Sequence, residues 1–245
     1  MNSSQFNKIL VVKHGSLGDI AFSILAMASI KQFFNNATID LLTEEKYVNF
    51  LSNSNYFNSI FKDNRKGIIN SLKVILKINQ NKYDLIIDLQ NSKRTNNYWS
   101  FLKFISEVKV NGSRSNCDIQ YVIPPQGTES PQQGLYNQLK LLGVNEIYQN
   151  VDWLSRDITA INEDKIILMI PGVSKSGKDK QWSPDKFAIL ASTLEKKGYH
   201  ICVIGQKSDK QTVETINNAC QKVIDLSDKS PVSYTHLRAH ETTDN

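Results

Sequence analysis

Residues 8–19 read KILVVKHGSLGD, and this stretch decides the fold. Residues 9–12 form an uninterrupted apolar run, which is typical of a strand buried on both faces of a sheet. A turn that contains Gly15 and Gly18 follows the run. Beyond the turn, apolar residues recur at helical spacing as far as Phe34, so we predict a helix over residues 19–34. A strand, a glycine turn and a helix in this order predict the opening unit of an open α/β sheet.

The same alternation continues along the chain. Predicted strands cover residues 8–13, 38–42, 83–89, 108–110, 165–170, 200–204 and 223–226. Predicted helices cover residues 19–34, 44–51, 67–79, 95–105, 132–142, 184–197 and 208–220. Because strands and helices alternate, we predict that the strands are parallel.

A polar stretch over residues 155–164 lacks a core pattern and predicts a domain junction. The expected domains are residues 1–160 and a second, short unit over residues 161–231. Residues 232–245, VSYTHLRAHETTDN, have no periodicity and resemble translated adapter or vector sequence. We therefore expect a non-native tail there.

The composition excludes several classes of protein. With 40% apolar and 22% charged residues, the chain has the mix of an ordinary globular protein. The net charge of +5 is mild and no block of Lys and Arg stands out, so we expect no nucleic-acid partner. Three scattered cysteines are too few for a disulfide framework or a zinc site. The start has no signal-peptide pattern and no run reaches about 18 apolar residues, so we expect a cytoplasmic protein.

The glycine turn is the first candidate site. Main-chain N–H groups at a helix start form an anion site, and Gly15 and Gly18 let a ligand approach them. The dinucleotide fingerprint G-x-G-x-x-G is absent, which disfavours a dehydrogenase although Asp40 could mimic its ribose-binding acid. Asp19 has two interpretations: an aspartate that stabilises the helix start, or a general base. His14 adjoins the turn, but the sequence identifies no partner for it.

Two further segments could bind anions. Residues 172–179, GVSKSGKD, nearly match a P-loop, but Asp179 replaces the magnesium-binding hydroxyl and Pro184 delays the helix, so we reject a P-loop nucleoside triphosphatase. Two interpretations remain for Lys180. It could bind a phosphate group together with this loop, or it could be an ordinary lysine on the surface. Lys93 and Arg94 follow a predicted strand and could hold an anionic acceptor, or they could be solvated charges at a helix start.

Taken together, these segments resemble glycosyltransferase family 9, the bacterial heptosyltransferases of lipopolysaccharide core synthesis. The resemblance rests on ILVVKHGSLGD, on YDLIIDLQNSKR, and on IPGVS followed by KQWSPDKFAILASTLEKKGYHICVIG. It implies a GT-B-like α/β fold with two Rossmann-like, doubly wound domains, of which the second is incomplete. The first domain would bind the acceptor and the second the nucleotide-sugar donor.

The resemblance also implies roles for single residues. Asp19 matches the catalytic base and Lys180 the lysine on the donor phosphate. Ser174 falls among hydroxyls near the donor diphosphate, and Asp209 lies roughly where the family has an acidic ribose contact. Gly18 is also expected to bind the donor. Lys93 and Arg94 are expected to bind the acceptor.

The implied reaction is an inverting sugar transfer that uses no metal and no cofactor. The expected partners are a nucleotide sugar such as ADP-heptose and a lipid A–core oligosaccharide, at the cytoplasmic face of the inner membrane. The family's D-T/S-G-x-x-H segment at the donor site is absent, so we expect a truncated family member. Two alternatives stay open: an inactive fragment that binds nucleotide or lipid, and a relative that uses another sugar donor.

Overall fold

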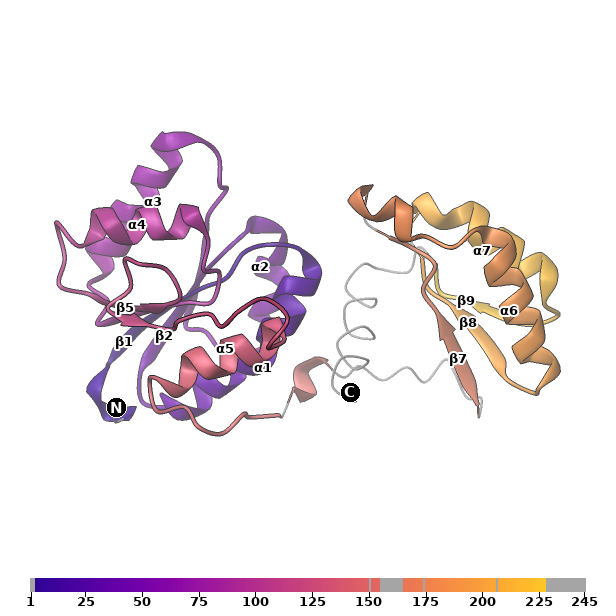
Figure 1. Cartoon of the computed structure of the whole chain (residues 1–245), viewed down its shortest axis with the longest axis horizontal. Coiled ribbons are helices and arrows are strands. Elements are labelled where there is room, and N and C mark those ends of the chain that lie inside the picture. Colours follow the sequence, from indigo (N-terminus) through magenta and orange to yellow (C-terminus); the bar gives the residue numbers. More distant parts are fainter. Residues whose placement is uncertain (1–2, 150, 155–164, 174, 206, 228–245) are drawn as a thin grey trace. The chain divides into compact units, whose positions relative to one another are not determined.

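The computed structural model describes residues 3–149, 151–154, 165–173, 175–205 and 207–227. These residues form two compact units, residues 3–154 and residues 165–227 (Figure 1). The predicted domain boundary after residue 160 and the predicted tail over residues 232–245 lie outside the described residues. Both stay predictions.

The first unit is built around a sheet of six strands. Its strands are β1 Lys8–Val12, β2 Thr38–Thr43, β3 Ser59–Lys62, β4 Leu85–Asp88, β5 Lys109–Gly112 and β6 Ile119–Gln120. Its α-helices are α1 Leu17–Phe33, α2 Glu45–Ser52, α3 Gly67–Asn81, α4 Lys93–Leu102 and α5 Pro131–Lys140. Every pair of neighbouring strands is parallel, in the order β3-β2-β1-β4-β5-β6. This is the strand order of a Rossmann sheet, whose direction of winding reverses between β1 and β4.

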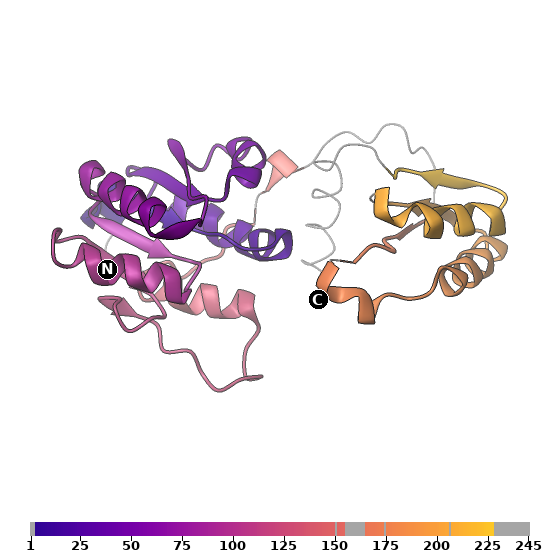
Figure 2. The same ribbon diagram turned by 90° about the horizontal axis from the view of Figure 1, so that it is seen from above.

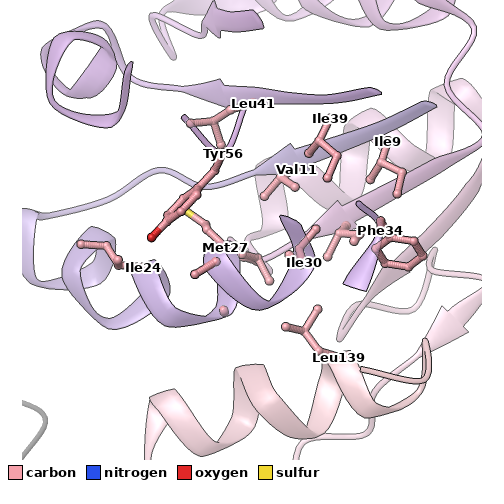
Figure 3. Close-up of a cluster of buried hydrophobic side chains, with 14 of the residues drawn as sticks. Ile9, Val11, Ile24, Met27, Ile30, Phe34, Ile39, Leu41, Tyr56 and Leu139 are labelled. Atoms are coloured by element: carbon pink, nitrogen blue, oxygen red, sulfur yellow. The ribbon is translucent and has the colours of Figure 1, made fainter. Parts of the chain in front are cut away.

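Helices cover both faces of this sheet (Figures 1 and 2). Successive residues of a strand point to opposite faces, so Ile9 and Val11 pack with α1 and α5. Figure 3 shows this cluster, in which Met27 and Ile30 of α1 face the strands. Leu10 and Val12 face the other way and contact the core side of α3 and α4. The run predicted to be buried on both faces is thus confirmed.

Two helices begin two residues earlier than predicted. The first begins at Leu17 instead of Asp19, because the Ser16 side chain accepts a hydrogen bond from the Asp19 N–H and acts as the N-cap. The fourth begins at Lys93 instead of Thr95, because Ser92 caps it in the same way. Both capping boxes place charged or polar side chains in the first turn, at the edge of the sheet where the strands end.

Two strands were not predicted. The third strand is half exposed and the sixth has only two residues. Both are outer strands of the sheet, and a short outer strand needs no apolar run because one flank faces no neighbouring strand. Their sequences therefore lack the pattern on which strand prediction depends.

The described part of the second unit has three parallel strands in the order β7-β8-β9. The strands are β7 Ile166–Met169, β8 His200–Val203 and β9 Val223–Asp225, and the helices are α6 Pro184–Lys196 and α7 Lys210–Ala219. Short 3₁₀ helices cover Lys175–Lys180 and Lys207–Asp209. Both α-helices contribute to one core with Met169, Ile201 and Val203, so they pack on the same face. Each predicted strand and helix of this unit is present, and no end differs from the prediction by more than two residues.

Candidate functional site

The candidate site of the first unit lies where β1 and β4 end. Ligands of open α/β sheets bind at this reversal point, outside the carboxyl ends of the strands. Here the Lys13 Nζ donates a hydrogen bond to the Leu89 carbonyl at 3.1 Å, and the His14 N–H donates to the Gln90 side chain at 3.0 Å. These bonds join the segment after β1 to the segment after β4 across the reversal point.

Gly15 has a conformation that other residues rarely adopt. Its φ is +116°, and a Cβ built on it would lie 2.6 Å from the Asp19 Oδ2. The Gly15 N–H donates to Glu44 at 3.0 Å, and its carbonyl accepts from the Tyr47 hydroxyl at 3.0 Å. The glycine therefore allows both the turn and the close approach of the Asp19 carboxylate. Gly18 is different: it lies inside α1, and a Cβ there would meet only the Ser16 Oγ, at 3.8 Å.

Asp19 occupies the first turn of α1 and is exposed. Its Oδ2 accepts hydrogen bonds from the Ser16 N–H and hydroxyl, each at 2.7 Å. The interpretation as a helix-start aspartate is thus confirmed. The carboxylate also remains open to solvent at the candidate site, so its role as a base stays a prediction.

A buried network of polar side chains lies beside this turn and was not foreseen. The His14 Nε2 is 3.5 Å from the Asp63 Oδ2, and both side chains are almost fully buried. Asp63 also accepts a hydrogen bond from the Tyr98 hydroxyl at 2.9 Å. Burial lowers the pKa of His14 to about 4 although the Asp63 carboxylate opposes that shift. His14 is therefore neutral at neutral pH.

Arg94 belongs to this network, whereas Lys93 does not. The Arg94 guanidinium donates to the Tyr98 hydroxyl at 2.5 Å, to the Ser71 hydroxyl at 3.0 Å and to the Arg65 carbonyl at 3.1 Å. Most of its donors are thus used within the protein. Lys93 is exposed in the first turn of α4. The two predicted acceptor-binding residues therefore differ: Arg94 is bonded within the protein, whereas Lys93 is exposed to solvent.

Glu44 connects the glycine turn to the β3–α3 segment. Its Oε1 accepts from the Gly15 N–H and, at 2.9 Å, from the Arg65 guanidinium. Partial burial opposes ionisation of Glu44, but these hydrogen bonds and Lys46 together hold its pKa below the usual value. Glu44 thus fixes the turn that carries Asp19.

Two ionisable groups lie underneath the site. Burial lowers the pKa of Lys13, and the carboxylates of Asp19 and Asp88 oppose that shift. Asp88 is fully buried at the end of β4, and burial raises its pKa. The Trp99 Nε1 donates to its Oδ2 at 2.7 Å, and the N–H groups of Gln90 and Asn91 donate to its Oδ1. This network holds the segment after β4 in place.

In the second unit, Asp209 lies against the two glycine turns that follow β7 and β8. Its side chain is buried, with an exposed fraction of 6%. A Cβ on Gly172 would lie 2.5 Å from the Asp209 Oδ2, and a Cβ on Gly205 would lie 3.3 Å from the Asp209 Cβ. The glycines therefore make room for this carboxylate at the carboxyl ends of the strands.

The other donor-binding predictions have different outcomes. Lys180 ends the 3₁₀ helix before α6 and is exposed. Beside it, the Gln181 side chain donates to the Pro171 carbonyl at 3.2 Å, which joins this segment to the turn after β7. Ser174 lies outside the described residues. Asp19, Gly18, Lys93 and Arg94 belong to the first unit, and Lys180 and Asp209 to the second.

Two searches covered the described residues alone. Within them, no three His, Cys, Asp or Glu side chains gather as a set that could hold a metal ion. The helices in these ranges also include none that is both long and apolar enough to span a bilayer.

Comparison with known proteins shows what the chain is similar to. Residues 136–229 match the model of glycosyltransferase family 9 (heptosyltransferase). Lipopolysaccharide heptosyltransferase 3 of Escherichia coli (strain K12) is 23% identical over an aligned length of 233 residues, gaps included, and the alignment covers 83% of this chain. The chain spans 65% of the length of that relative.

Solved structures share the fold. A family 9 glycosyltransferase from Veillonella parvula DSM 2008 superposes with a TM-score of 0.71 at 18% identity, covering 98% of this chain and 73% of that one. The E. coli heptosyltransferase WaaC, solved with ADP-2-deoxy-2-fluoro heptose, superposes with a TM-score of 0.67 at 14% identity, covering 94% and 79%. The predicted α/β fold of GT-B type is thus confirmed, and residues 136–229 of the chain are similar to glycosyltransferase family 9 (heptosyltransferase).

Proposed function

We propose that the protein transfers a heptose, or a related sugar, from a nucleotide-sugar donor such as ADP-heptose to a lipopolysaccharide core acceptor. The family match over residues 136–229 carries this proposal. The relative from E. coli K12 is a lipopolysaccharide heptosyltransferase, and the WaaC structure holds an ADP-heptose analogue, which supports the donor and acceptor classes. For a lipid-linked acceptor of this kind, we propose that the reaction takes place at the cytoplasmic face of the inner membrane.

In the proposed reaction, the Asp19 carboxylate takes the proton of an acceptor hydroxyl. The hydroxyl oxygen bonds to the anomeric carbon while the bond from that carbon to the donor diphosphate breaks on the opposite face. ADP leaves, and the configuration of the sugar inverts. The step needs no metal and no cofactor. Exposure of Asp19 in the first turn of α1 supports its role, because a base must reach the hydroxyl directly or through one water.

The donor-binding residues act on the leaving group. Lys180 and Ser174 stabilise the negative charge that grows on the departing diphosphate, and such stabilisation is greatest in the transition state. Exposure of the Lys180 side chain supports this role, since it is free to meet a phosphate. Asp209 is buried against Gly172, so we propose that it supports the donor turn and reaches the ribose only if the turn rearranges.

A transfer assay tests the proposal. The full chain is incubated with ADP-heptose and a lipid A–Kdo acceptor, and product is measured by mass spectrometry. Asp19→Asn keeps the shape of the side chain but removes the base, so we expect a loss of about a hundredfold or more. Ser16→Ala is the matched control, because it breaks the same capping box while keeping the carboxylate. It should lose about 1 kcal/mol of stability and far less activity.

The outcomes separate the alternatives. Equal activity of Asp19→Asn and the parent would remove Asp19 from the mechanism. Donor binding without any product would favour a binding module over an enzyme. Product with another nucleotide sugar and none with ADP-heptose would keep the enzyme class and change the donor.

A further inference from the structure

The outward face of α3 exposes an apolar stripe. Ile68 and Ile69 are 79% and 73% exposed, and Leu72 and Leu76 are 42% and 53% exposed. These positions recur every three or four residues, so they lie along one side of the helix. Other apolar positions of α3 pack in the core, and the exposed stripe is not part of that cluster.

The same segment is strongly basic. Between residues 62 and 82 the single acidic residue is Asp63, which is fully buried next to His14 and so adds no charge to the surface of α3. The basic residues of this segment are Lys62, Arg65, Lys66, Lys73, Lys77 and Lys82. Lys62 and Arg65 pair with Glu45 and Glu44.

Lys66 and Lys73 flank the apolar stripe most directly. Both are exposed, and neither has an ion-pair partner among the residues that the structure describes. The first turn of α3 also contains no acidic residue, so its positive helix end is not neutralised there. The stripe is thus bordered by positive charge that is not neutralised within the described chain.

We propose that this face of α3 docks on an anionic lipid surface. An apolar stripe with a basic border matches an interfacial helix, whose apolar side chains enter the acyl boundary while its lysines stay at the headgroups. A second copy of the chain is a poorer occupant, because a two-fold contact through this face would bring the same lysines together. The inference rests on the proposed function only for its setting, a lipid-linked acceptor.

Vesicle binding tests the docking face. The full chain is sedimented with phosphatidylcholine vesicles that contain about one third phosphatidylglycerol, and with pure phosphatidylcholine vesicles. We expect binding to the anionic vesicles that weakens with added salt. The double variant Ile68→Ser, Ile69→Ser should weaken it on the order of tenfold. The double variant Lys66→Gln, Lys73→Gln should weaken it by roughly fivefold for each lysine, because each is worth about 1 kcal/mol near such a surface.

Ile189→Ser is the matched control. Ile189 lies on α6 of the second unit and is 68% exposed, which is similar to Ile69. Since all of these side chains are exposed, the variants should keep the melting temperature of the parent. The control should also keep the parent's vesicle binding.

Several results would overturn the docking face. The proposal fails if the chain stays in the supernatant with anionic vesicles, or if the control weakens binding as much as the stripe variant. Self-association that the stripe variant abolishes, without vesicle binding, would assign the face to a second copy. Sugar transfer to a water-soluble acceptor is measured separately. Transfer without vesicle binding would reject only the docking face, and vesicle binding without transfer would reject only the proposed function.

Discussion

Replacement of Gly15 by alanine tests how the turn after β1 positions Asp19. The φ of +116° is strained for any residue with a Cβ, which costs about 1–3 kcal/mol. The new Cβ would also lie 2.6 Å from the Asp19 Oδ2 and 3.0 Å from its Cγ, so the carboxylate must move. Loss of the capping box then costs about 1 kcal/mol more. We expect the first unit to lose about 2–4 kcal/mol of unfolding free energy.

Gly18→Ala is the control within the same turn. Its Cβ meets only the Ser16 Oγ at 3.8 Å, and the position is helical. Alanine in place of glycine inside a helix stabilises by roughly 0.5–1 kcal/mol. The two substitutions add the same methyl group three residues apart, yet they should shift stability in opposite directions.

Urea unfolding followed by tryptophan fluorescence measures both variants. Trp99 is fully buried and Trp153 packs against the core of the first unit, whereas Trp182 of the second unit is about half exposed. The signal therefore reports mainly on the first unit. An unfolding free energy of Gly15→Ala within about 0.5 kcal/mol of the parent would refute the strained turn. Destabilisation of Gly18→Ala by the same amount as Gly15→Ala would refute it as well.

Three further predictions concern buried groups. The pKa of His14 falls from 6.5 to about 4 on folding, so the unfolded chain binds protons more readily between these values. Stability should therefore drop by about 3 kcal/mol as pH falls from 6.5 to 4, and His14→Gln should remove this part of the slope in pH-dependent urea unfolding. Trp99→Phe removes the 2.7 Å hydrogen bond to the buried Asp88 and should lower the unfolding free energy by about 2 kcal/mol in the same assay. An unchanged unfolding free energy would show that this bond does not contribute to stability. Gly172→Ala places a Cβ 2.5 Å from Asp209 and should destabilise the second unit by about 1–3 kcal/mol, measured by hydrogen exchange of its amides; unchanged protection would contradict the close approach.

Much of the fold follows from local pattern. The apolar runs of β1 and β4 read as buried strands because parallel strands in this sheet are covered on both faces. The positions of the helices followed from the spacing of their apolar residues. Helices α1 and α4 begin two residues earlier than predicted because Ser16 and Ser92 are their N-caps. The outer strands β3 and β6 were missed because partial exposure removes the apolar pattern.

The candidate site could be predicted from the sequence only in part. Asp19 was identifiable because it follows the glycine turn directly, so its position depends on short-range geometry. Glu44 and Tyr47 were missed, although they hold that same turn, because they come from the segment after the second strand. A polar residue that follows a strand can be assigned to a site only when the adjacent strands in the sheet are known.

The sequence by itself determined the α-helices, the strands other than β3 and β6, the glycine turns and the family that the residues resemble. Only the tertiary structure decided that His14 meets Asp63, although β2 separates β1 from β3 in the sheet. It also decided that Arg94 turns inward and that Asp209 fills the space beside Gly172. The physical reason is that secondary structure depends mainly on residues that are close together in the sequence. Contacts between polar side chains depend instead on which strands lie next to each other in the sheet.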